Sequence, residues 1–492
     1  MTKKHLTFDF VEDKDFRDYS RGLNSKAKFY NVRSIQEAAR KQVLKKQLGL
    51  TSFMKGKQGT VRAADTHDSW TSKGGHTYAS LSYHFLAEDF TLFSCPFDIK
   101  RISGHTYASC IAETIHEMGQ FRGIASTVSC TDCEWSMVAA WRELNHCGQG
   151  CVCHRIEKIT GVFFDCPGHK ATMTKARKLA GHFHHSTQAK SKLKELGAIM
   201  LGAEHPSGLA TLQDVITRWW STYNMCERLM VLRGVLQALE AIEGGIYVPE
   251  DVRLTNAEWA IVEMGRLVLK PFMQAQKVFE GELYGTNALV IPIIFQLRSM
   301  LIAELARQEH MLTLDVNATN IVQCLRLMVA ALLQRFGDGT NVVPFNTPHG
   351  NAVEGARRQP CGMTLWQAYA TCMDVRTKDL YGIPIPEHAA LWDRVRDFAV
   401  ELAMESYARV QADAVVVGAA AGVAPAPAAP PAAPAAVEYG FDRPVAAQAP
   451  VAPVLDMAEH FRNCVRIELI NWQAVPLVNN PFYDNLEWWK GD

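Results

Sequence analysis

The chain has 492 residues, of which 48% are hydrophobic, and its 51 basic residues balance 51 acidic ones at a formal net charge of zero. This length predicts two or more domains, and the neutral average excludes a uniformly basic nucleic-acid binder. The longest run of large apolar residues, 288–295, is too short to cross a bilayer, and the N-terminus MTKKHLTFDFVEDKDF has no apolar core typical of a secretory signal. We therefore expect an intracellular protein with no membrane partner and thirteen mostly reduced cysteines.

Basic residues are concentrated in two stretches of the sequence. The first belongs to an expected N-terminal basic helical segment, residues 1–58, and contains Lys26, Lys28, Arg33, Arg40, Lys41, Lys45, Lys46, Lys55 and Lys57. The second contains Lys170, Lys175, Arg177, Lys178, Lys190, Lys192 and Lys194, interleaved with His182, His184 and His185. Both stretches can neutralise DNA phosphates, and both are equally compatible with solvated helix faces.

Residues 59–167 alternate strand-like and helix-like patterns. Strands are predicted at 59–68, 76–87 and 90–99, a helix at 105–118, a fourth strand at 123–130, a helix at 137–144, and a fifth strand at the start of 150–164. Three strands, helix, strand, helix, strand is the order of an RNase H-like sheet. The predicted fold class is therefore an α/β RNase H-like core, with a mixed sheet and flanking helices.

The remainder of the chain divides by composition. Residues 168–412 predict a large all-α insertion that interrupts the core, with amphipathic runs at 211–242, 257–278 and 319–336. Residues 413–453 are rich in alanine and proline, which predicts a disordered or extended linker. A short terminal segment, 454–492, follows the linker.

Two acidic residues stand at the ends of predicted strands that are neighbours in an RNase H-like sheet. Asp68 ends the first strand, and Asp132 follows the fourth in STVSCTD. Two carboxylates at one sheet edge can hold divalent metal ions for phosphodiester chemistry. Asp65 lies an odd number of positions from Asp68 and is expected on the other face. The alternative for either strand-end acid is an ordinary turn or cap residue.

Several motifs in the same order resemble blocks of the hAT superfamily of cut-and-paste DNA transposases. DSWTS at 68–72 resembles D-x-W-T-S, TDCEWSM at 131–137 resembles T-D-N-x-x-N-M, CVCHRIEKI at 151–159 is similar to the C-x-x-H block, and TRWWSTYNMCERL at 217–229 is similar to T-R-W-N-S. Segments at 269–281, 368–380 and 480–490 resemble later blocks. FVEDKDFRDY at 10–19 resembles the segment before the catalytic domain in BED zinc-finger relatives. The collinear resemblance covers most of the chain outside the linker.

The resemblance implies a set of site residues and partners. Asp68 and Asp132 would be the first two of three catalytic, metal-binding acids, with Mg²⁺ or Mn²⁺ as the cofactor of an active enzyme. Trp219 would stack on a flipped base, with Arg218 beside it near the phosphates; the alternative for Trp219 is core packing. DNA is the expected partner, other proteins are a second class, and the nucleus is the expected location.

Departures from the family pattern bear on activity. The third family acid lies in an E-R-x-F-S block, which the sequence does not reach before Asp492, so that acid and most of the dimerisation region are expected to be absent. Cys133 and Ser136 replace two Asn of the second block, and no Cys/His quartet of a BED finger precedes Asp65. We expect a transposase-derived DNA-binding protein with impaired catalysis or a domesticated role.

Two enzymatic readings remain open beside that expectation. In one, the chain is an active transposase, or a truncated one, that cuts and joins DNA by two-metal chemistry. In the other, it is an RNase H-type nuclease that uses another acid. The status of the protein as an enzyme is therefore uncertain at this stage.

A cluster of cysteine and histidine residues raises the question of a zinc site. Its members are Cys147, Cys151, Cys153, His154, Cys166 and His169. Their spacing is not that of a standard zinc finger, and alternation along the predicted fifth strand places Cys151 and His154 on opposite sides. We expect reduced core thiols with a structural His154 rather than a zinc site.

Overall fold

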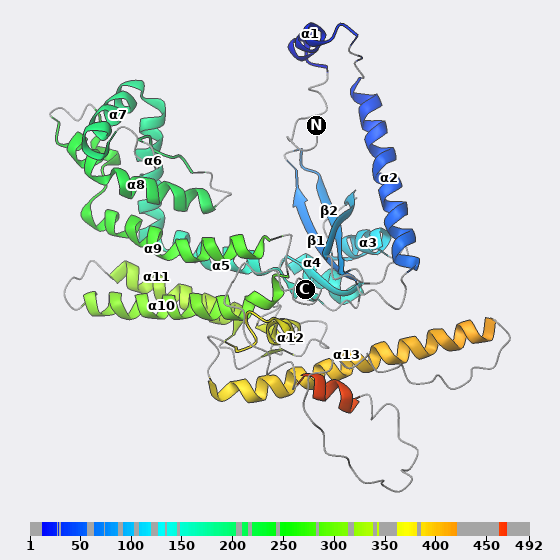
Figure 1. The fold of residues 1–492 in the computed structure, drawn as a ribbon. Helices are drawn as coiled ribbons and strands as arrows, with labels where there is room; N and C mark the ends of the chain where they lie inside the picture. The colour runs from blue at the N-terminus through cyan, green and yellow to red at the C-terminus, as the bar shows by residue number, and fades with distance from the viewer. Residues whose placement is uncertain are drawn as a thin grey trace, which may run out of the picture.

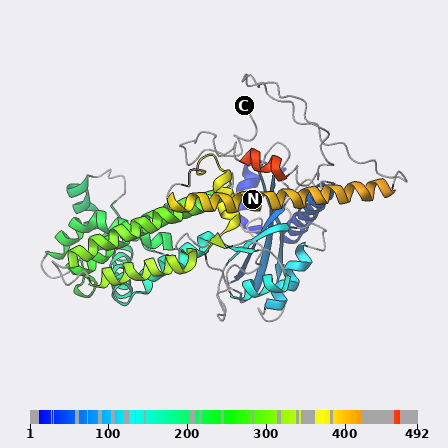
Figure 2. The same cartoon turned by 90° about the horizontal axis from the view of Figure 1, so that it is seen from below.

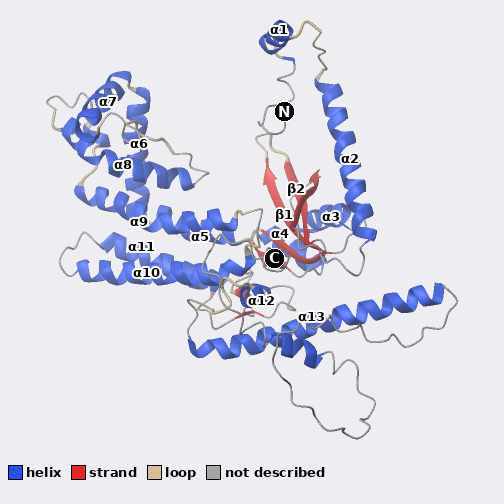
Figure 3. Cartoon of the chain, in the orientation of Figure 1, coloured by secondary structure: helices blue, strands red, loops and turns tan. Residues whose placement is uncertain are grey.

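The computed structural model contains the whole chain, and its described residues fall in separate ranges. These are 12–26, 28, 31–56, 63–72, 74–86, 92–102, 108–119, 126–132, 135–144, 148–202, 209–214, 219–242, 247–281, 285–312, 319–337, 342–343, 362–380, 385–420 and 462–469. Within them the chain is mostly helical, and the larger of its two sheets forms a separate lobe (Figures 1 and 3).

The main sheet has five strands in the order β3-β2-β1-β4-β5. They are β1 (Ala63–Thr71), β2 (Thr77–Leu86), β3 (Leu92–Arg101), β4 (Ser126–Thr131) and β5 (Gly148–Gly150). The first three pair as an antiparallel meander, whereas β4 runs parallel to β1 and β5 parallel to β4. The predicted α/β class and mixed sheet are confirmed, as is the expectation that the first and fourth strands are neighbours.

One face of this sheet is covered by helices. Helices α3 (Ala108–Gly119) and α4 (Trp135–Leu144) pack on each other, and α3 packs on β2 and β3. The core they enclose contains Leu81, Tyr83, Phe85, Phe97, Ile111, Ile115, Met118 and Met137. The alternation of buried and half-buried residues along β2 is that of a strand with one covered face.

The N-terminal segment contains two helices, α1 (Lys14–Leu23) and α2 (Val32–Gly56). Helix α2 is attached to the sheet lobe near its C-terminal end, where the Gln47 side-chain amide donates to the Phe97 carbonyl oxygen at 2.6 Å. The Phe53 and Phe85 rings lie 5.6 Å apart. The last turns of α2 therefore belong to the sheet lobe, and its first turns extend away from it (Figure 1).

The predicted position of the fifth strand, at the start of 150–164, is wrong. Strand β5 is only three residues, and helix α5 (Val152–Asp165) begins two residues later. Ile156, Ile159 and Phe163 are fully buried at helical spacing, and they pack into the core of the helical lobe instead of the sheet. The sequence CVCHRI looks strand-like locally, but this helical periodicity over the following residues determines its structure.

The predicted predominantly helical region is confirmed among the described residues. Its helices are α6 (Pro167–His185), α7 (Thr187–Leu201), α8 (Trp219–Glu240), α9 (Asn256–Phe279), α10 (Val290–Leu312), α11 (Thr319–Phe336), α12 (Leu365–Met373) and α13 (Ile385–Ala420). Two short turns, η5 (Glu250–Val252) and η6 (Asn287–Leu289), and a two-strand pair, β6 (Val342–Val343) with β7 (Met363–Thr364), accompany them. Helices α5 to α13 are joined by one continuous hydrophobic core.

Helix α10 is long and apolar. The stretch Asn287–Met311 is long and apolar enough to cross a membrane, with a mean hydropathy of 1.8, and half of its most apolar window is buried inside the protein. Helix α10 packs against α9, α11 and α12. A core helix of a soluble protein has the same length and composition.

Helix α13 is the longest in the chain. It begins in contact with α12 and projects away from the helical lobe, passing the sheet lobe in the view from below (Figure 2). It continues through Ala420, so residues 413–420, expected in the linker, are helical. The alanine and valine residues that precede Pro425, the first proline of the linker, are compatible with a helix. Residues 421–453 lie outside the described ranges.

The two lobes are joined through α5 and the segment before it. Arg155 is 2% exposed, and its guanidinium Nη1 donates to the carbonyl oxygens of Gly362 at 2.9 Å and Arg335 at 3.4 Å. The same guanidinium lies 5.5 Å from the centre of the Phe336 ring. Arg155 therefore ties the start of α5 to the end of α11 and to the chain leading into β7.

Replacing Arg155 by Met retains much of the buried volume and leaves those two carbonyl groups without their donor. We expect a loss of about 2–4 kcal/mol in the free energy of unfolding. Urea titration followed by circular dichroism measures it. Lys194→Met, at an exposed position of α7, is the matched control and should change the midpoint little. Equal midpoints for both variants would contradict the anchoring role of Arg155.

Candidate functional site

The two predicted acids follow the last residues that pair β1 with β4. The parallel register ends where His67 of β1 pairs with Thr131 of β4, and Asp68 and Asp132 are the next residue of each segment. Neighbouring paired strands lie about 5 Å apart, so we expect the two acids to lie close to each other. Asp68 is exposed and Asp132 is half-buried. Residues about 64 positions apart in sequence are thus brought together by a single strand pairing.

Asp65 lies on the opposite face from Asp68, as the alternation predicts. Asp65 is 3% exposed and His67 4% exposed, both on the helix-covered face. His67 Nε2 lies 3.0 Å from Asp65 Oδ1. The neighbouring Tyr83 has its pKa raised, first by burial and second by the Asp65 charge. This buried polar pair was not predicted from the sequence, because its two members resemble the exposed polar residues around them.

The face that carries Asp68 has a polar network of its own. Thr66 Oγ1 lies 3.0 Å from His84 Nε2, and His84 Nδ1 lies 2.9 Å from Ser94 Oγ, so one imidazole joins β1, β2 and β3. Burial lowers the pKa of His84, which favours the neutral ring at physiological pH. A neutral imidazole suits this bridging position because it offers one donor and one acceptor.

An aromatic pair stands beside Asp68 at the same end of β1. Trp70 is 40% exposed and stacks on Tyr78 of β2, with ring centroids 5.8 Å apart. Trp70 lies two residues beyond Asp68 on an extended strand and therefore on the same face. The tryptophan of the DSWTS motif is consequently at the surface of the sheet edge, in the same neighbourhood as the two acids.

Cys151 connects this edge to the helical lobe. Its backbone N–H donates to the Thr131 carbonyl oxygen at 2.6 Å, immediately before Asp132, and the residue forms the N-cap of α5. The neighbouring Cys153 thiol, which can donate to Cys151 Sγ, lowers the pKa of Cys151 to about 6, although burial opposes this shift. The pKa of Cys153 is raised correspondingly. A thiolate at the N-terminus of a helix is also favoured by the helix dipole.

The lowered pKa of Cys151 has a measurable consequence. Because the thiolate is the reactive form, alkylation of Cys151 by iodoacetamide should rise with pH and level off above about pH 6–7. Peptide mass spectrometry across a pH series follows the modification of each cysteine. Cys151→Ser should remove the component that reacts at low pH. A Cys151 rate that rises only above about pH 8 would show that the thiol is not activated.

The fold divides the cysteine and histidine residues that are close in sequence. Cys151 is the N-cap of α5 and His154 lies in its first turn, so the prediction that they alternate along a strand is wrong. Cys166 lies at the other end of this 14-residue helix, roughly 21 Å along its axis. Among the described residues no group of three or more His, Cys, Asp or Glu can hold a metal ion. Cys133 and Cys147 lie outside these residues.

The remaining members of that cluster are packed in the helical core. His169 is fully buried, its ring centroid lies 4.5 Å from that of Phe163, and burial lowers its pKa to about 4. Burial likewise raises the pKa of the Cys166 thiol, which contacts Cys324. Cys166 and His169 are therefore core residues. His154 is partly exposed, and its Nδ1 lies 3.9 Å from Glu157 Oε2.

The predicted DNA-contacting residues are at the start of α8. Trp219 is the first residue of that helix, but its side chain and the whole of Arg218 lie outside the described residues. Asp214, in the described segment 209–214, is 8% exposed. Asp214 Oδ2 accepts from Arg177 Nε at 2.7 Å and from Thr222 Oγ1 at 2.8 Å. Asp214 therefore links α6 to α8, and this contact was not predicted, since its members come from separate segments.

Comparison with known proteins identifies the helical part of this arrangement. Residues 151–265 match the family model described as the ZBED1 RNase-like helical domain. The match begins at Cys151, where the chain leaves the sheet edge, and ends within α9. It is consistent with a transposase-derived protein of the hAT/ZBED type. No curated protein matches the chain.

Proposed function

We propose that this protein is a hAT transposase-derived, nuclear DNA-binding protein whose catalytic activity is impaired. The observation that supports the proposal is the parallel pairing of β1 with β4, whose last pair is followed by Asp68 and Asp132, at the sheet edge from which α5 enters the helical domain matched by the ZBED1 model. The strand order β3-β2-β1-β4-β5, with β4 parallel to β1, is the one expected of an RNase H-like core. The two findings are independent, because the matched residues begin after the last strand of the sheet.

The two carboxylates fit a hard divalent cation. Mg²⁺ is commonly held by one or two protein carboxylates, with water and substrate phosphates completing its shell, and Asp68 is exposed to solvent. A bound Mg²⁺ or Mn²⁺ would supply charge stabilisation and activation of an attacking oxygen. Asp68 and Asp132 would hold the ion, and the exposed Trp70 would contact a nucleobase nearby.

Impairment is proposed from the second motif. Cys133 and Ser136 stand where the family block carries two asparagines, so the amide groups that would position the acid and its water are replaced. Loss of residues that orient a metal ligand typically costs 10- to 100-fold in affinity or activity. The alternative, an active transposase, is favoured by the retention of both acids at one edge.

Separate measurements of DNA binding and of DNA cleavage distinguish the impaired protein from the active transposase. We expect the full chain to bind duplex DNA in an anisotropy titration at low salt, and to nick supercoiled plasmid in Mg²⁺ or Mn²⁺ no faster than its Asp68→Asn variant does. The physical reason is that DNA binding depends on phosphate contacts spread over the surface, whereas cleavage depends on one precisely arranged metal site.

Glu113→Gln, an exposed acid on α3 in the same lobe, is the matched control for removal of one negative charge. Cleavage that Asp68→Asn and Asp132→Asn abolish and Glu113→Gln retains would establish the active transposase instead. Failure of the protein to bind any duplex at low salt would refute both functions.

A further inference from the structure

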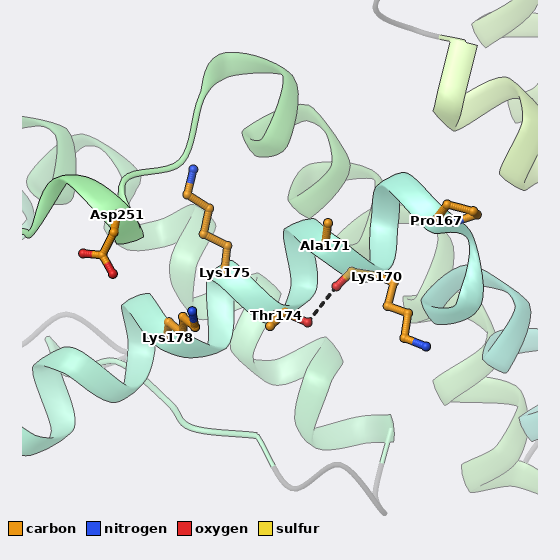
Figure 4. Close-up of a pocket in the computed structure, with 7 residues that line it drawn as sticks. All are labelled: Pro167, Lys170, Ala171, Thr174, Lys175, Lys178 and Asp251. Atoms are coloured by element: carbon orange, nitrogen blue, oxygen red, sulfur yellow. Dashed lines mark hydrogen bonds between the residues drawn. The ribbon is translucent and has the colours of Figure 1, made fainter.

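A groove along α6 has no role in the site described above. It has a volume of about 520 Å³ and is lined by Pro167, Lys170, Ala171, Thr174, Lys175, Lys178 and Asp251 (Figure 4). All but Asp251 belong to the Pro167–Lys178 part of α6, and η5 brings Asp251 against that helix. Lys175, Lys178 and Asp251 lie toward one end of the groove, and Lys170 lies toward the other, beside Pro167.

The three lysines of the groove differ in their partners. Lys175 Nζ lies 2.9 Å from Glu258 Oε2, and Glu258 also closes the capping box of α9 with Thr255, so this ammonium group is neutralised and fixed. Lys170 and Lys178 are exposed, and their ammonium groups make no hydrogen bond or ion pair with the part of the chain that the structure describes. These two ammonium groups are the ones available to an anion.

The helix that carries them is rigidly held. The opposite side of α6 buries Met173, Ala176 and Leu179 in the helical core. Eight residues separate Lys170 from Lys178, which places their backbone positions about 12 Å apart along one helix. Two fixed cationic positions at this spacing match a polymer with repeated negative charges better than a single small anion.

We infer that this groove binds the phosphodiester backbone of nucleic acid. The inference rests on the proposed function and specifies where on the helical domain the backbone would lie. The lining offers the ammonium groups of Lys170 and Lys178, which are phosphate ligands, whereas the Thr174 hydroxyl donates to the Lys170 carbonyl oxygen at 2.9 Å. It contains no aromatic ring and no side-chain amide with which to read a base, so the contact is independent of sequence.

Asp251 sets a limit on the affinity of the groove. Its carboxylate is exposed and faces the same groove as Lys178, where it repels a phosphate or competes for the ammonium group. Removal of this charge should therefore strengthen binding, the opposite of what removal of a lysine does. An increase in affinity from one substitution and a decrease from another, both in the same groove, test its role more strictly than a loss of binding alone.

The experiment is an anisotropy titration of the full chain with duplex DNA of about 30 base pairs and with an RNA duplex of the same length. Inorganic phosphate is added as a competitor, and each titration covers a salt series. Lys170→Gln combined with Lys178→Gln should weaken nucleic-acid binding by about tenfold at low salt and reduce the slope of log K against log salt by about 2. Asp251→Asn should tighten it by about two- to threefold. The preference between DNA and RNA identifies the source of the backbone.

The matched controls are Lys270→Gln combined with Lys277→Gln, two exposed lysines of α9 outside both basic stretches, and Glu250→Gln beside Asp251. The inference is overturned if the groove variants and their controls have equal affinities and salt slopes. It is also overturned if polyglutamate displaces the wild-type protein from DNA but does not displace the lysine variants. Different results refute the proposed function and the role of the groove. Absence of nucleic-acid binding by the wild type refutes the proposed function, whereas binding that is insensitive to the groove refutes only this inference.

Discussion

The parallel pairing of β1 with β4 is the constraint on which the rest of the structure depends. Pairing of β1 with β2 on its other edge makes β1 the central strand, and pairing with β4 brings the end of a second strand to the same edge. The register then determines which residues meet there. A shift of one position would turn the exposed Asp68 toward the helix-covered face, where burial of an unpaired carboxylate is costly, so the covered face opposes a slip of the strand.

The same edge is where the chain passes from sheet to helices. The hydrogen bond from the Cys151 N–H to the Thr131 carbonyl oxygen fixes the first residue of the α5 cap beside Asp132. Four residues later, Arg155 attaches α5 to the end of α11. The acid pair, the Cys151 thiol and the helical domain are therefore connected through one short segment. A displacement of α5 would alter all three together.

Much of this arrangement was predictable from the sequence, and the failures have physical causes. The order of strand-like and helix-like segments was sufficient to predict that the first and fourth strands are neighbours. The CVCHRI segment was assigned to a strand because short apolar runs do not distinguish strand from helix. The pairs Asp65 with His67 and Asp214 with Arg177 were missed because polar residues reveal a buried partner only once the chain is folded.

The most direct test of the account is whether positions 68 and 132 are neighbours in solution. With Asp68→Cys and Asp132→Cys combined, a strand spacing of about 5 Å lies within the Cα separation that a disulfide requires. Oxidation followed by peptide mass spectrometry should detect a link between these two positions. Asp68→Cys with Ser80→Cys, paired in the antiparallel register, is the positive control. A link in the control without one between positions 68 and 132 would contradict the pairing of β1 with β4, and with it the candidate site.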